Sequence, residues 1–126
     1  MSVGVKICGL STPDAVAAAV AGGAAFVGFV FYARSPRAVT PEQAAALGRL
    51  VPQSVGKVGL FVDEGDDRLA EVLAAVPLDL LQLHGSETPA RVAEIRARHG
   101  TKVMNAVSVA GPDDIAASAA FAEVAD

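Results

Sequence analysis

The sequence predicts an α/β fold in which helices cover a parallel sheet. Apolar, β-rich runs alternate five times with segments of helical pattern. The crossovers between successive runs are long enough for parallel pairing. The chain has 126 residues, the size of one ordinary domain with one core. We therefore expect a single domain over residues 1–126.

Five apolar runs are the expected strands. They are rich in Val, Ile, Leu and Phe and are separated by turn residues and helical segments. The runs are Val3–Cys8, Ala25–Tyr32, Val55–Val62, Leu78–His84 and Lys102–Val109.

Threonine–proline pairs mark the starts of three expected helices. The hydroxyl caps the helix, and the proline needs no N–H at the first helical position. The pairs are Thr12-Pro13, Thr40-Pro41 and Thr88-Pro89. Thr40 with Gln43 also fits a capping box, and Gly100 is expected to end the fourth helix. The remaining helices are expected over Arg68–Ala75 and from Pro112 onward.

Two architectures fit five βα units. They complete a doubly wound sheet of the flavodoxin type, or they form about the first five units of a (β/α)8 barrel, which needs at least ~200 residues. The strand patterns favour the barrel, because a doubly wound sheet meets helices on both faces, whereas alternation here gives the strands one face with polar groups. The groups assigned to this face are Lys6 with Cys8, Lys57 with Gly59 and Phe61, and Gln82 with His84.

Composition and charge exclude several classes of partner. The net charge is −4, with one Tyr and no Trp, so the chain lacks the basic surface and the rings that nucleic-acid binding uses. No membrane partner is expected, because Gly22-Gly23 divides the uncharged stretch Ala15–Ala33 into a helical half and a strand-like half. One cysteine and two histidines argue against disulfides and a metal site. We expect a cytoplasmic protein.

Cys8 is the first candidate for chemistry. A lone cysteine is most often a small buried hydrophobe, but Cys8 stands at the end of the first expected strand, beside Gly9 and on the same face as Lys6. A neighbouring lysine favours the thiolate, which can remove a proton from carbon as a general base. The sequence therefore predicts a catalytic Cys8, with Lys6 next to it in the binding site.

Polar side chains near the ends of two other strands complete the candidate site. Arg37 follows the second strand on a loop stiffened by Pro36, and a guanidinium pairs with a carboxylate through two parallel hydrogen bonds. Gln82 and His84 lie one pleat apart at the end of the fourth strand, so both can point at one ligand. Asp63, at the end of the third strand, is interpreted as an ordinary acid before a helix.

Four motifs in this order resemble the phosphoribosylanthranilate isomerases of tryptophan biosynthesis. They are Lys6-Ile7-Cys8-Gly9-Leu10, Gly28-Phe29-Val30-Phe31 leading to Ser35-Pro36-Arg37, Val58-Gly59-Leu60-Phe61-Val62, and Gln82-Leu83-His84-Gly85. That family adopts a (β/α)8 barrel. It converts N-(5-phosphoribosyl)anthranilate to 1-(2-carboxyphenylamino)-1-deoxyribulose 5-phosphate by an Amadori rearrangement, without cofactor or metal. The resemblance, which extends over nearly the whole chain, implies the same barrel and activity here.

The resemblance also implies roles for the candidate residues. Cys8 resembles the family's general base, which takes the proton from the sugar C2 after the ring has opened to a Schiff base. Arg37 would hold the anthranilate carboxylate, while Gln82 and His84 would line the mouth of the barrel beside the substrate. The implied partner is a phosphorylated sugar–anthranilate, a small molecule.

Two departures from the family pattern concern the fifth and sixth strands. The family's general acid is an aspartate a few apolar residues after a pair that Ala125-Asp126 resembles, so we expect the acid beyond residue 126, together with the phosphate-binding loops. Asn105 stands where the family more commonly has lysine, which removes a positive charge from the mouth. We expect this chain by itself to be inactive.

Two other interpretations are open at this stage. A complete flavodoxin-like domain could act as a binding or signalling module, with Asp63 and Lys102 as candidates, although the acidic pair that a magnesium-dependent phosphoacceptor needs after the first strand is missing. A partial barrel, in contrast, exposes the edges of its first and last strands, through which it could self-associate.

Overall fold

The computed structural model describes residues 2–126, so Met1 of the expected domain lies outside the described residues. Strands and helices alternate along the chain, as the sequence predicts. The strands are β1 (Lys6–Ile7), β2 (Phe26–Val30), β3 (Gly56–Phe61), β4 (Leu80–Leu83) and β5 (Lys102–Asn105). The helices are α1 (Pro13–Ala21), α2 (Pro41–Gly48), α3 (Asp66–Ala75), α4 (Pro89–His99), α5 (Pro112–Ser118) and a short 3-10 helix, η1 (Ala119–Phe121).

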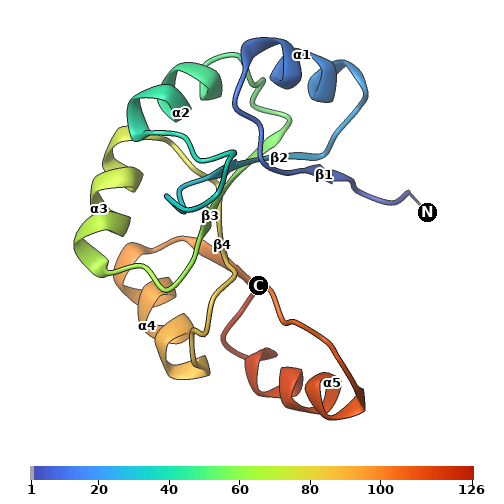
Figure 1. Cartoon of the computed structure of the whole chain (residues 1–126), viewed down its shortest axis with the longest axis vertical. Coiled ribbons are helices and arrows are strands. Elements are labelled where there is room, and N and C mark those ends of the chain that lie inside the picture. Colours follow the sequence, from blue (N-terminus) through green and yellow to red (C-terminus); the bar gives the residue numbers. More distant parts are fainter. Residues whose placement is uncertain (1) are drawn as a thin grey trace.

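The order of the strands decides between the two architectures. All neighbours pair in parallel, in the order β1-β2-β3-β4-β5. A flavodoxin-type sheet places its first strand between the second and the third, whereas β1 lies at an edge here. Figure 1 shows α1 to α4 as an arc along one side of the sheet. This is the arrangement of part of a (β/α)8 barrel, and the doubly wound alternative is excluded.

The helix-covered side of the sheet, called here the outer face, forms the core. Its side chains come from alternate strand positions and are almost completely buried against α1 to α4. Each such side chain contributes about 1.5–3 kcal/mol through burial. The outer-face strand residues include Val27, Phe29, Phe61, Leu81, Leu83 and Val103, and the helices contribute Val16, Ala44, Leu69, Val72, Val92 and Ile95.

The strand register corrects one sequence-based assignment. Residues in register on neighbouring parallel strands point to the same side of the sheet. Gln82 is in register with Leu60, and Lys6 with Phe26, which places them on the inner face, opposite the helices. Lys57 is in register with Val27 and therefore lies on the outer face. The expected grouping of Lys57, Gly59 and Phe61 with the polar residues was wrong, because alternation defines two faces without showing which one the helices cover.

The predicted helix caps are confirmed. The threonine hydroxyls before α1, α2 and α4 each accept the expected backbone N–H. In the capping box, the backbone N–H of Thr40 donates to Oε1 of Gln43 at 2.9 Å. Gly100 ends α4 in the left-handed conformation, with φ +59°. The third helix begins at Asp66, two residues before the expected start, with Gly65 as its N-cap.

The strands are shorter than the apolar runs, most clearly at the edges of the sheet. β1 has two residues and β5 four. No helix within residues 2–126 has the length and apolar character needed to span a membrane.

Candidate active site at the carboxyl edge

Cys8 lies on the inner face at the carboxyl end of β1, where Gly28 makes room for its side chain. A Cβ on Gly28 would lie 3.1 Å from Cys8 Sγ and 3.4 Å from Lys6 Cε. The side chains of Cys8 and Lys6 therefore share the space over Gly28. The backbone N–H groups of Gly9 and Leu10 both donate to the Gly28 carbonyl, at 3.0 and 3.1 Å, which fixes the turn that follows Cys8.

Arg37, on the loop after β2, lies over Gly9, the residue that follows Cys8. A Cβ on Gly9 would lie 2.7 Å from Arg37 Nη1 and 2.8 Å from its Cδ, so the Arg37 side chain lies directly over the Gly9 backbone. The loop is held by the Arg37 N–H, which donates to Ser35 Oγ at 3.2 Å, and Gly9 has φ +76°. A side chain at position 9 would be strained and would displace the guanidinium.

Gln82 and His84 come from β4 and the residue after its end. Gln82 is only 9% exposed, and its Oε1 is buried without a hydrogen-bond partner within residues 2–126. An unpaired buried amide oxygen costs about 1–3 kcal/mol, which a bound ligand or water can relieve. His84 is exposed, and its N–H donates to the Phe61 carbonyl at 2.9 Å. β2 and β3 separate this pair from Cys8 along the shared edge.

Two acidic residues join the loops at this edge: Asp63, and Glu87, which the sequence does not single out. The Glu87 carboxylate accepts the backbone N–H groups of Asp63 and Gly85, each at 2.9 Å, and Glu87 is 8% exposed. Asp63 Oδ1 accepts the N–H of Ser86 at 2.7 Å. Asp63 also has φ +49°, unusual for a residue other than glycine. The interpretation of Asp63 as an ordinary acid before a helix misses these contacts.

Asp126 lies at the opposite edge, at the amino end of β5. Its carboxylate accepts the Val103 N–H at 3.0 Å and pairs with Arg96 at 2.6 Å. The Val103 hydrogen bond and the Arg96 charge hold the pKa of the Asp126 carboxyl below its ordinary value of 3.8. This position, far along the strand direction from Cys8, supports the expectation that Asp126 is not the acid partner of Cys8.

Asn105 is not placed as expected. It is in register with Leu83, a residue of the buried outer face, while Gln82 is in register with Met104. The Asn105 position therefore shares the side of the sheet that faces the helices, and the expectation that it removes a charge from the mouth on the inner face is not supported by the register.

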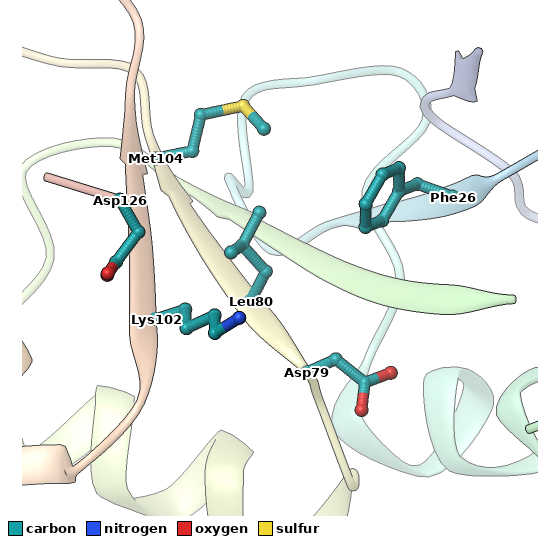
Figure 2. Close-up of a pocket in the computed structure, with 6 residues that line it drawn as sticks. All are labelled: Phe26, Asp79, Leu80, Lys102, Met104 and Asp126. Atoms are coloured by element: carbon teal, nitrogen blue, oxygen red, sulfur yellow. The ribbon is translucent and has the colours of Figure 1, made fainter. Parts of the chain in front are cut away.

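A cavity of about 600 Å³ opens at the amino ends of the strands, away from the candidate residues. Its apolar part comes from the inner face, where Figure 2 shows Phe26, Leu80 and Met104 around one space, with Lys102 and Asp79 below them. The cavity is not lined by any of the candidate residues of the barrel active site, which are Lys6, Cys8, Arg37, Gln82 and His84. Within residues 2–126 there is no group of three or more His, Cys, Asp or Glu side chains arranged to hold a metal ion.

The fold and the candidate residues together define the class of protein. Parallel strands in consecutive order, helices on the outer face, and a thiol, a guanidinium, an amide and an imidazole near the carboxyl ends of the strands are features of β/α-barrel enzymes, whose active sites lie at that end.

Comparisons with known proteins identify the family within this class. Residues 5–125 match the family model of N-(5'-phosphoribosyl)anthranilate (PRA) isomerase, and the chain belongs to this family. It is 60% identical to the isomerase of Rhodospirillum centenum and 58% identical to that of Paracoccus denitrificans, over all 126 residues in both cases. The crystal structure of the Thermotoga maritima isomerase superposes with a TM-score of 0.91 at 35% identity, over 97% of this chain and 58% of that one. The chain spans about 59% of the length of these two curated relatives.

Proposed function

We propose that the protein containing this chain catalyses the Amadori rearrangement of N-(5-phosphoribosyl)anthranilate in tryptophan biosynthesis. Residues 1–126 are a single domain that supplies the first five βα units of its barrel. The observation that carries the proposal is that Arg37 lies over Gly9, the residue that follows Cys8, at the carboxyl edge. A related isomerase, 35% identical with a TM-score of 0.91, has a structure in complex with reduced 1-(o-carboxyphenylamino)-1-deoxyribulose 5-phosphate. This supports a phosphorylated small molecule as the substrate class.

In this proposal Cys8 is the general base. An acid protonates the furanose ring oxygen, the ring opens to a Schiff base, and the Cys8 thiolate removes the proton from C2. The electron pair of the broken C–H bond forms the enolamine, which tautomerises to the ketose. The Lys6 side chain lies beside this base, because it shares the space over Gly28 with the sulfur.

Arg37, Gln82 and His84 bind the substrate in this proposal. The Arg37 guanidinium, over Gly9, is suited to the anthranilate carboxylate. The unpaired Gln82 Oε1 is suited to a substrate N–H or O–H donor. His84, exposed at the end of β4, contacts the substrate from the far side of the mouth. No cofactor enters this mechanism.

The proposal extends to the behaviour of the 126-residue chain alone. With the Asp126 carboxylate tied to Val103 and Arg96 at the amino edge, no acid partner for Cys8 has been identified among the described residues, and we expect the isolated chain to be inactive. Exposed apolar residues stand in or near its two edge strands, with Val5 and Ile7 at β1 and Val107 shortly after β5, which supports self-association. The single cysteine supports a cytoplasmic location.

A chimera tests the proposed activity. Residues 1–126 replace the matching 59% of the Rhodospirillum centenum isomerase, and consumption of the fluorescent substrate is followed. We expect turnover at ordinary enzymatic rates, and a loss of about 10²–10⁴-fold in kcat for Cys8→Ser. A folded chimera without turnover would contradict the proposed function, and full activity of Cys8→Ser would remove Cys8 from its role.

A further inference from the structure

The backbone around His84 is held by the end of β3, by the loop after β3, and by Glu87 of the same loop as His84. His84 N–H donates to the Phe61 carbonyl at the end of β3, Gly85 N–H to the Glu87 carboxylate, and Ser86 N–H to Asp63. Three consecutive N–H groups are therefore fixed in place. The loops after β3 and β4 lie outside regular secondary structure. Two of the three acceptors are accordingly carboxylate side chains.

The two carboxylates connect the loops reciprocally. Glu87, in the loop after β4, accepts the N–H of Asp63 in the loop after β3, and Asp63 accepts the N–H of Ser86 in the other direction. Glu87 accepts its two N–H groups while 8% exposed. Burying a carboxylate is costly unless hydrogen bonds compensate. The two backbone N–H groups provide this compensation for Glu87.

Steric and backbone features support the same arrangement. A Cβ on Gly85 would lie 2.6 Å from the Asp63 Cγ, so the Asp63 carboxyl group is packed directly against the Gly85 backbone. Asp63 adopts φ +49°, which disfavours most side chains. This conformation brings its carboxylate onto the loop that carries His84.

We infer that Glu87 and Asp63 are positioning residues for His84: their carboxylates fix the 84–86 backbone, and with it the place of the imidazole at the mouth. They act through hydrogen bonds to the backbone and transfer no proton. The functional part of this inference rests on the proposed isomerase activity. The unpaired Gln82 Oε1, two residues before His84, is an independent sign that the end of β4 faces a ligand.

The decisive variant is Glu87→Gln in the chimera described above. The side chain keeps its size, but one acceptor becomes an NH2 group that faces a backbone N–H. We expect kcat/KM to fall about tenfold, because small displacements of a positioned group are costly in rate. In a His84→Ala background the same substitution should change kcat/KM by less than about twofold, since the group it positions is gone. An equal fall in both backgrounds, or no fall with His84 present, would overturn the inference.

Asp63 provides a matched pair of variants in case Glu87→Gln fails to fold. Asp63→Asn keeps an oxygen for Ser86 and tolerates positive φ, whereas Asp63→Ala loses both advantages. We expect Asn to retain kcat/KM within about threefold and Ala to lose about tenfold. Equal values for the two would contradict the inference. Asp126→Asn, which removes a carboxylate from the amino edge, is the control for general destabilisation.

A second readout separates this inference from the proposed function. Amide exchange and the His84 ring resonances of the 15N-labelled chimera are compared with and without Glu87→Gln. We expect exchange at Asp63 and Gly85 to accelerate about tenfold and the His84 ring signals to shift or broaden. If the unmodified chimera is inactive, the proposed function fails, while these signals still decide the positioning role. Unchanged His84 signals would overturn it.

Discussion

The space over Gly28 offers the sharpest test of how the site is built. A methyl group at position 28 would lie 3.1 Å from Cys8 Sγ, 3.3 Å from Cys8 Cα and 3.4 Å from Lys6 Cε. Ordinary contacts of a Cβ begin near 3.4 Å, so Gly28→Ala forces the sulfur and the β1 backbone to move by a few tenths of an ångström. Overpacking of this kind costs about 1–3 kcal/mol.

The displaced group is the proposed base, so activity should fall further than stability alone explains. A misplacement of about 1 Å can cost about 10²-fold in rate, so the smaller shift predicts a loss of about three- to tenfold in kcat/KM for the chimera. The rate is measured under conditions in which the variant chimera is fully folded. Gly65→Ala is the matched control, because a Cβ there meets nothing within 4 Å.

Urea unfolding of a double-mutant cycle tests the same reasoning without activity. Cys8→Ala removes the sulfur from its close approach to the new methyl group, so Gly28→Ala should cost less in the Cys8→Ala background than in the unmodified chain. A coupling free energy of at least about 0.5 kcal/mol is expected for residues in contact. Strict additivity of the two substitutions would refute the packing argument.

Three further predictions concern other parts of the sheet. Gly85→Ala should destabilise the chain by about 1–3 kcal/mol, because its Cβ would overlap the Asp63 carboxyl; a thermal unfolding midpoint within 1 °C of the unmodified value, on the order of the smallest resolvable change, would contradict this. The pKa of Asp126 is lowered first by the Val103 N–H and then by Arg96. The ionised Asp126 carboxylate therefore stabilises the folded chain above pH 3.8, and this contribution is lost as the pH falls through the lower folded-state pKa. Asp126→Asn should therefore lower the free energy of unfolding at pH 7, and the variant and the unmodified chain should differ less below pH 3.8, as followed by urea unfolding. A difference between the two chains that is independent of pH would count against the ion pair. The 126-residue chain alone should elute as a dimer or larger species in size-exclusion chromatography with light scattering, and a monodisperse monomer would argue against self-association through the sheet edges.

Local signals account for the part of the fold that the sequence predicts well. The three threonine caps and the capping box between Thr40 and Gln43 involve residues within one helical turn, so their spacing is visible along the chain. The same holds for the location of Cys8 and His84, which depends only on where apolar runs end. The strand patterns favour the barrel and the family motifs imply it, and the consecutive strand order confirms it.

Contacts between distant segments account for what the sequence did not predict. Glu87 reaches Asp63 across 24 positions, and no local pattern distinguishes it from the surface acids nearby. Lys57 was assigned to the wrong face because polarity was used in place of register, and the long lysine side chain lies along the outer face near Gly48. A buried glutamate after a strand end would have been the signal for Glu87, but burial is known only once the loops are folded.

The carboxylates at the amino ends and at the carboxyl ends of the strands have different partners, and this difference affects the charge of the ligand that the sheet can bind. At the amino edge Asp126 neutralises Arg96. At the carboxyl edge Glu87 and Asp63 receive backbone N–H groups, and within residues 2–126 Arg37 and Lys6 take part in no ion pair. Glu87 and Asp63 thus accept backbone N–H groups and do not neutralise the charges of Arg37 and Lys6. A chain of net charge −4 in this way keeps two unpaired cations, Lys6 and Arg37, near the strand end that carries Cys8, which suits an anionic ligand.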